Sequence, residues 1–141
     1  MILDLDKFLG VHANALKLHE RRTELLANNL ANADTPGFKA RDLDFRSAMA
    51  AATGPAANAG QQVTHYAGQG DSGNLQSGDL SPGSTEAFIK YRTPLAPSLD
   101  GNTVDAQLEQ SAFAENAVRY QATLSLLSTQ IRTLMTAITG Q

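Results

Sequence analysis

The feature that most constrains the fold is an unbroken heptad repeat in the last third of the chain. Apolar side chains recur in alternating steps of four and three residues and form what we call the apolar seam: Phe113, Ala117, Tyr120, Leu124, Leu127, Ile131, Leu134 and Ile138. A repeat of this length predicts one long helix over residues 102–139 that packs along this seam against another helix. Asn102 is the predicted N-cap, Asp105 suits the positive end of the helix, and Gly140 is a natural stop.

The outer face of this predicted helix is unusually poor in charge. After Arg119 the only charged residue is Arg132, and the remaining outer positions carry mainly Ser, Thr and Gln. An ordinary surface helix shows more charge on the face that meets water. The pattern therefore favours a helix that neighbouring helices enclose on most sides.

The start of the chain predicts a second long helix, over residues 4–33. One stripe of this helix contains Leu5, Leu9, His12, Leu16, His19, Thr23, Leu26, Leu30 and Ala33. A second stripe beside it contains Phe8, Val11, Ala15, Leu18, Arg22, Leu25 and Asn29. Thirty helical residues would be roughly 45 Å long, too long for the core of so small a domain. We expect Leu9, Leu16, Leu26 and Leu30 to join the seam between the two helices.

The first helix is predicted to end near Asp34. Thr35 precedes Pro36 and is therefore biased away from the helical region. The four residues from Thr35 to Phe38 fit a type II turn, with Pro36 second and Gly37 third.

The middle of the chain, residues 45–101, has a different composition. Seven of the eleven glycines lie between Gly54 and Gly83, mixed with Ala, Ser, Gln and Asn. Two short stretches, 63–66 and 86–92, favour extended structure, but neither could bury much apolar surface alone. This composition predicts a flexible, loop-like segment with at most a small β-hairpin.

Together these patterns predict a mostly α fold with three segments. Residues 1–44 form the first helix and its turn, residues 45–101 a variable, Gly-rich middle, and residues 102–141 the last helix. The long N- and C-terminal helices are expected to pair as an antiparallel coiled coil or helical hairpin.

Charge and composition exclude several classes of function. The 11 basic and 14 acidic residues leave a net charge of −3, so no nucleic acid is expected as a partner. The absence of cysteine excludes disulfides, zinc–thiolate sites and thiol nucleophiles. Asp4 and Asp6 interrupt the apolar start that a cleaved signal peptide needs, and no stretch approaches the length of a membrane span.

Several motifs suggest chemistry only superficially. Residues 68–73 match the dinucleotide pattern GxGxxG, and residues 70–73 resemble a serine-protease nucleophile loop, but neither has the flanking elements that its chemistry requires. His12 and His19 are seven residues apart, too far for one metal ion, and are expected to contact a neighbouring helix. Asp42 and Asp44 fit a solvated turn. We therefore predict no catalytic, cofactor-binding or metal site, no small-molecule substrate and no enzyme activity.

Two regions of the chain resemble a known family. Residues 26–42, LANNLANADTPGFKARD, resemble the N-terminal signature of the bacterial flagellar basal-body rod family. The signature is an Asn-rich helix end followed by a turn and an aromatic residue, carried here by Asn28, Asn29, Asn32, Thr35, Pro36, Gly37 and Phe38. Phe38 stands where Tyr is common. Residues 91–92, 97–105 and 113–121 resemble the proximal rod subunits of this family.

The resemblance implies a structural subunit that self-assembles through its terminal helices into the proximal part of the flagellar axial drive shaft. The implied partners are copies of itself, other flagellar rod proteins, the membrane-ring junction and the flagellar type III export apparatus. The implied location is the periplasmic rod of the basal body, reached by export without a cleaved signal peptide.

Three further hypotheses follow from particular residues. Phe45 and Met49 resemble the short hydrophobic element by which rod and hook proteins contact the export gate, although a local packing role is equally consistent with them. Asn28 is expected to bridge to an adjacent subunit. A soluble coiled-coil adaptor or export chaperone is the alternative function, and the uncharged last helix argues against it.

Overall fold

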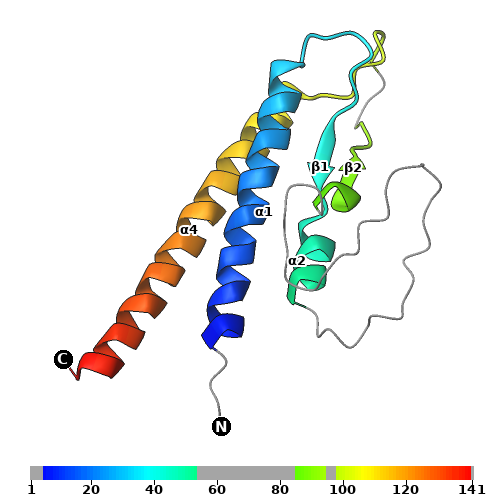
Figure 1. The fold of residues 1–141 in the computed structure, drawn as a ribbon. Helices are drawn as coiled ribbons and strands as arrows, with labels where there is room; N and C mark the ends of the chain where they lie inside the picture. The colour runs from blue at the N-terminus through cyan, green and yellow to red at the C-terminus, as the bar shows by residue number, and fades with distance from the viewer. Residues whose placement is uncertain (1–4, 54–84, 95–97, 141) are drawn as a thin grey trace, which may run out of the picture.

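The computed structural model describes residues 5–53, 85–94 and 98–140. Two long helices lie side by side, and a small group of short elements packs on the other side of the first helix (Figure 1). In chain order the elements are α1 (Leu5–Ala31), β1 (Arg41–Leu43), α2 (Phe45–Thr53), η2 (Glu86–Phe88), β2 (Ile89–Tyr91) and α4 (Ala106–Thr139). None of the described helices is long and apolar enough to cross a membrane.

The prediction of a mostly helical chain with paired terminal helices is confirmed. Side-chain contacts join His12 to Gln130, His19 to Asn116, and Asn29 to Glu109, so α1 and α4 meet in opposite order along the chain. Helix α4 begins after Asp105, whose carboxylate accepts hydrogen bonds from the N–H groups of Gln107 and Leu108. It ends at Gly140, whose φ of 74° is the left-handed conformation expected of a helix stop.

The prediction that Asn102 caps α4 is wrong. Its side chain is buried and instead donates hydrogen bonds to the carbonyl groups of Asn32, Ala33 and Thr35, at 3.1, 2.7 and 3.0 Å. These carbonyls lie just past the end of α1, where a helix leaves acceptors without partners of their own. Asn102 therefore closes the end of the first helix, and Asp105 takes over the cap of α4.

The predicted turn after α1 is confirmed. Gly37 has a φ of 73°, and the N–H of Phe38 donates to the carbonyl of Thr35 at 3.3 Å. The segment before α4 lies along this turn, because the N–H of Gly37 donates to Asp100 and the N–H of Thr103 donates to Phe38. The turn and the approach to α4 therefore form one unit.

Residues 45–53 and 86–91, within the predicted loop-like middle, form regular elements. Strand β1 pairs antiparallel with β2, with Asp42 opposite Lys90. Strand β2 lies within the predicted extended stretch 86–92, and its partner is β1, with Leu43 opposite Ile89. Residues 63–66 and 68–73 lie outside the described residues.

Helix α2 was not predicted. Its start is fixed by Asp44, whose carboxylate accepts hydrogen bonds from the N–H and the hydroxyl of Ser47 at 3.1 and 2.9 Å. Four of its nine residues are alanine, the best helix former.

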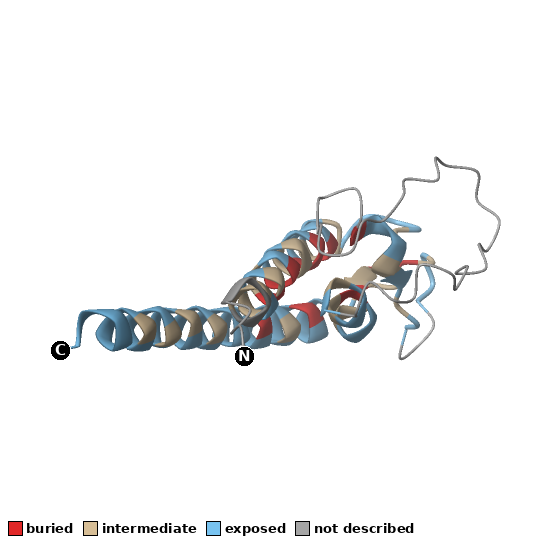
Figure 2. Ribbon diagram, turned by 60° about the horizontal axis from the view of Figure 1, so that its bottom comes forward, coloured by how far each residue is buried: buried red, intermediate tan, exposed pale blue. Residues whose placement is uncertain are grey.

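The apolar core lies between α1 and the short elements. Leu18 and Leu25 of α1 pack with Leu43 and Ala48, and partly buried side chains surround them: Phe45, Met49, Ala52, Phe88 and Ile89. Figure 2 shows that the buried positions concentrate in this half of the molecule, whereas the C-terminal part of α4 is mostly exposed. The second stripe of α1 is therefore the one that forms the core.

Candidate assembly surface

The face that α4 turns toward α1 is largely polar. Four polar residues recur every seven positions on this face and form what we call the polar column: Glu109, Asn116, Thr123 and Gln130. Glu109 and Asn116 are buried, and Thr123 and Gln130 are half-buried. Leu127, between Thr123 and Gln130, and Leu134, one turn beyond Gln130, are also half-buried. Buried polar groups need hydrogen-bond partners, so the partners of this column determine the pairing.

Asn116 makes the most complete set of contacts. Its side-chain nitrogen donates to the carbonyl of His19 and to the hydroxyl of Thr23, both at 2.8 Å. Its oxygen lies 2.8 Å from Nδ1 of His19 and accepts a hydrogen bond from it, which places the imidazole proton on Nδ1. Thr23 in turn donates to the carbonyl of His19. Together with the contact between His12 and Gln130, this confirms that both histidines face a neighbouring helix.

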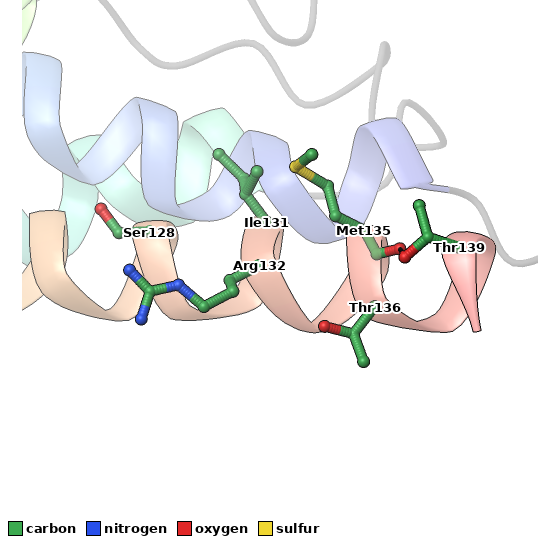
Figure 3. Close-up of a pocket in the computed structure, with 6 residues that line it drawn as sticks. All are labelled: Ser128, Ile131, Arg132, Met135, Thr136 and Thr139. Carbon is green, nitrogen blue, oxygen red and sulfur yellow. Dashed lines mark hydrogen bonds between the residues drawn. The ribbon is translucent and has the colours of Figure 1, made fainter. Parts of the chain in front are cut away.

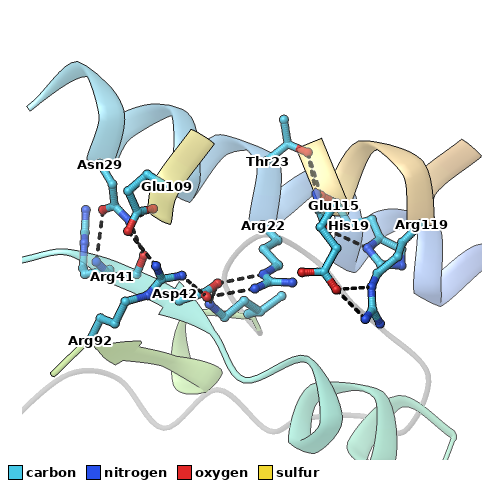
Figure 4. A network of polar contacts seen from close by, with 12 residues as sticks. His19, Arg22, Thr23, Asn29, Arg41, Asp42, Arg92, Glu109, Glu115 and Arg119 are labelled. Carbon is cyan, nitrogen blue, oxygen red and sulfur yellow. Dashed lines mark hydrogen bonds and ion pairs between the residues drawn. The ribbon is translucent and has the colours of Figure 1, made fainter. Parts of the chain in front are cut away.

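A second polar cluster joins α1, β1, α4 and Arg92, which directly follows β2 (Figure 4). The guanidinium of Arg92 donates to Glu109 of α4 at 2.7 Å and to Asp42 of β1 at 2.5 Å. Arg22 of α1 makes a two-pronged contact to the same Asp42 at 2.9 and 3.0 Å. Asn29 donates to Glu109 at 3.1 Å. The two cations and two carboxylates balance in charge.

The prediction of a solvated turn is wrong for Asp42, which lies in β1 and pairs with Arg22 and Arg92, whereas Asp44 lies at the surface and pairs with Lys90. Burial alone would raise the pKa of Asp42, but hydrogen bonds from Arg22 and Arg92 outweigh it, so the pKa lies below its usual value. A hydrogen bond from Lys90 is the main reason that the pKa of Asp44 is lowered to about 2. Both carboxylates therefore stay ionised as structural ion pairs.

Asn29 shows how the asparagines at the end of α1 are used. Its amide donates to the carbonyl of Arg41 at 2.7 Å and accepts from the N–H of the same residue at 3.0 Å, as a neighbouring strand would. Asn32 donates to the carbonyl of Asn28 one turn earlier. The side chain of Asn28 is exposed, so its predicted contact with an adjacent subunit stays a prediction.

Most of the predicted apolar seam is exposed in the single chain. Phe113, Tyr120, Leu124 and Ile131 are 38%, 37%, 39% and 44% exposed, and Ile138 is 84% exposed. Ala117 is also exposed, and only Leu127 and Leu134 are half-buried. On α1, Leu26 is buried, and Leu9, Leu16 and Leu30 are half-buried. The single chain therefore does not enclose α4, and its apolar seam faces outward.

The seam continues into an open hollow near the end of α4. The hollow is lined by Ser128, Ile131, Arg132, Met135, Thr136 and Thr139. Figure 3 shows Ile131 and Met135 projecting on one side of the helix, and Arg132 and Thr136 on the other. No group of His, Asp and Glu side chains in the described part of the chain is arranged to hold a metal ion.

Phe45 and Met49 both pack against the core cluster. The ring of Phe45 lies 4.5 Å from the ring of His19, measured between centroids. In the folded chain these residues therefore have a packing role.

Comparison with known proteins supplies the biological context. Residues 9–39 match the family model described as flagella basal body rod protein. The chain is 45% identical to the flagellar basal body rod protein FlgB of Cereibacter sphaeroides, over 94% of each chain. It is 41% identical to FlgB of Escherichia coli K12, over 98% of this chain and 97% of the relative. FlgB of Aeromonas hydrophila is 40% identical over nearly the full length of both.

Proposed function

The chain belongs to the flagellar basal body rod protein family, and on that premise we propose that it builds the proximal part of the rod by self-assembly through its terminal helices. It is a structural subunit of the flagellar basal body rather than an enzyme. The alternative function, a soluble adaptor or export chaperone, finds no support among these relatives.

The observation that carries the proposal is the outward-facing apolar seam. A soluble monomer rarely leaves so many large apolar side chains of one helix face in water. Burying each of them against a neighbouring helix would contribute about 1–3 kcal/mol. Because every copy of the chain carries the same apolar seam, the stabilisation would accumulate along an assembly.

The geometry of a rod adds a condition on this contact. A surface that binds the same surface on a second copy closes into a dimer, whereas growth along an axis needs two different surfaces. We propose that the apolar seam of one subunit packs against a different helix face of the next subunit. We also propose that α1 and α4 form an antiparallel coiled coil within the assembly. Val118, Leu126 and Met135 are also exposed, which supports contact with more than one neighbour.

The remaining assignments concern place and partners. We propose that the chain contacts copies of itself, other rod proteins and the membrane-ring junction in the periplasm, after travelling through the type III export apparatus. Isolation of basal bodies tests this assignment. An epitope-tagged chain should co-purify with rings and rod and be depleted from the soluble cytosol. A tagged chain found only in the cytosol would contradict it.

Export through a gate contact is proposed for Phe45 and Met49. Phe45→Ala should lower the amount of chain that leaves the cytosol, because an unfolded substrate would lose its aromatic contact to the gate. Phe88→Ala is the matched control, since Phe88 packs against the same core but lies outside the motif. The amounts of chain inside and outside the cytosol are compared by immunoblot. Equal export of the two variants would leave Phe45 with its packing role only.

A further inference from the structure

Two neighbouring rows of residues on α4 are each placed so that they could face α1. The apolar row Ala117, Leu124 and Ile131 follows the polar row Asn116, Thr123 and Gln130 by one residue, which is about 100° around the helix. Both rows flank the same four positions: Phe113, Tyr120, Leu127 and Leu134. By apolar periodicity alone α4 should turn the apolar row toward α1. The structure has the polar row there instead.

We propose that the contact set of Asn116, supported by Glu109 and Gln130 of the polar column, is the specificity element of the helix pair. It directs α4 onto its own α1 on one face and in one register, and it thereby keeps the apolar row free. A polar residue at a heptad core position is known to fix register at a cost in stability. This inference concerns the fold of the single chain and does not depend on the proposed function.

The contacts of Asn116 explain why one face of α4 is strongly preferred opposite α1. Both N–H groups and the oxygen of its amide are used, by the carbonyl of His19, the hydroxyl of Thr23 and Nδ1 of His19. The side chain is fully buried. A rotation or a one-turn slip of α4 would separate Asn116 from all three groups and leave the buried ones unpaired, which is costly.

Asn116 is also the best residue to test. Gln130 reaches only His12, and its Oε1 is buried without a hydrogen-bond partner among the described residues. Thr123 belongs to the same column, but its hydroxyl donates back to the carbonyl of Arg119 within α4. Asn116→Leu therefore removes hydrogen bonds between α4 and α1. Thr123→Leu introduces the same apolar side chain but removes no described hydrogen bond between the two helices.

Engineered cysteines can report which face of α4 meets α1, because the natural chain has none. His12→Cys is combined with Gln130→Cys to detect the observed face, and with Ile131→Cys to detect the rotated face. Each pair is placed in the full-length chain with the natural Asn116, with Asn116→Leu and with Thr123→Leu. The yield of intrachain disulfide is measured on a non-reducing gel after brief oxidation, and helix content is measured by circular dichroism.

The natural chain and Thr123→Leu should favour the disulfide between positions 12 and 130. Asn116→Leu should keep its helix content and lower the ratio of the 12–130 to the 12–131 disulfide at least fivefold. An unchanged ratio would overturn the proposal. A loss of helix in Asn116→Leu beyond that in Thr123→Leu would also overturn it, because Asn116 would then stabilise the helices rather than select their contact face.

Discussion

Replacing Ile131 by aspartate is expected to abolish swimming while leaving the single chain folded. Ile131 lies on the exposed apolar row, is 44% exposed, and belongs to the open hollow on α4. A carboxylate there is solvated in the free chain, but an apolar contact with a neighbouring helix would bury it unpaired. The penalty recurs at every copy, so we expect rods to be lost rather than weakened.

Soft-agar motility and electron microscopy of basal bodies measure this effect. Thr129→Asp is the matched control, because Thr129 is exposed on the opposite side of α4 and its hydroxyl donates to the carbonyl of Ser125 in the same helix. We expect strains with the control substitution to retain rods and motility. Normal swimming by the Ile131→Asp strain would show that this row faces solvent in the rod, and the proposed role of the apolar seam would be wrong.

The second large effect is expected from Arg92→Leu. Arg92 is the cation that joins Glu109 of α4 to Asp42 of β1. Asp42 would keep its contact with Arg22, but Glu109 is 1% exposed and, of its side-chain partners among the described residues, would retain only Asn29. Removing one partner of a buried ion pair typically costs about 3–5 kcal/mol. A domain of ordinary stability has only about 5–15 kcal/mol in total, so we expect substantial unfolding.

Urea denaturation followed by circular dichroism measures this loss. Arg119→Leu is the control, since Arg119 pairs with Glu115 on the surface and such pairs contribute about 0–1 kcal/mol. The double variant Arg92→Leu with Glu109→Leu should recover much of the stability, because the unpaired buried carboxylate is then absent. If Arg92→Leu lowers the free energy of unfolding no more than Arg119→Leu does, the polar cluster around Arg92 does not stabilise the packing of α4 against the short elements.

The sequence predicts the long-range architecture better than the contacts that hold it. The long last helix, the turn around Gly37 and the stop at Gly140 follow from local signals, and the structure has all three. The contact face of α4 depends instead on Asn116 meeting His19, 97 residues away. Apolar periodicity carries no information on such polar pairs, so it predicts the face that the chain leaves open.

The same limit explains the other errors. Asn102 looks like a cap for the helix that follows it, and only the folded chain brings the end of α1 within its reach, 67 to 70 residues away. The local sequence does not reveal that Arg22 and Arg92 pair with Asp42, or that Lys90 pairs with Asp44, because these cations come from other segments of the chain. Helix α2 does carry a local signal, the Asp44 cap before an alanine-rich run, but apolar periodicity alone does not reveal it.

The dependence of α1 on Asn102 has a consequence for the order in which the chain can fold. A chain that emerges with its N-terminus first presents α1, the turn and β1 long before their partners exist. The carbonyl groups at the end of α1 lack the side-chain amide of Asn102 until that residue has emerged. Asp42 likewise lacks its partner Arg92, and Asn29 lacks its partner Glu109. Contacts of such long sequence separation form slowly and late. The native state therefore becomes available only once most of the chain has emerged, which fits the export proposed above.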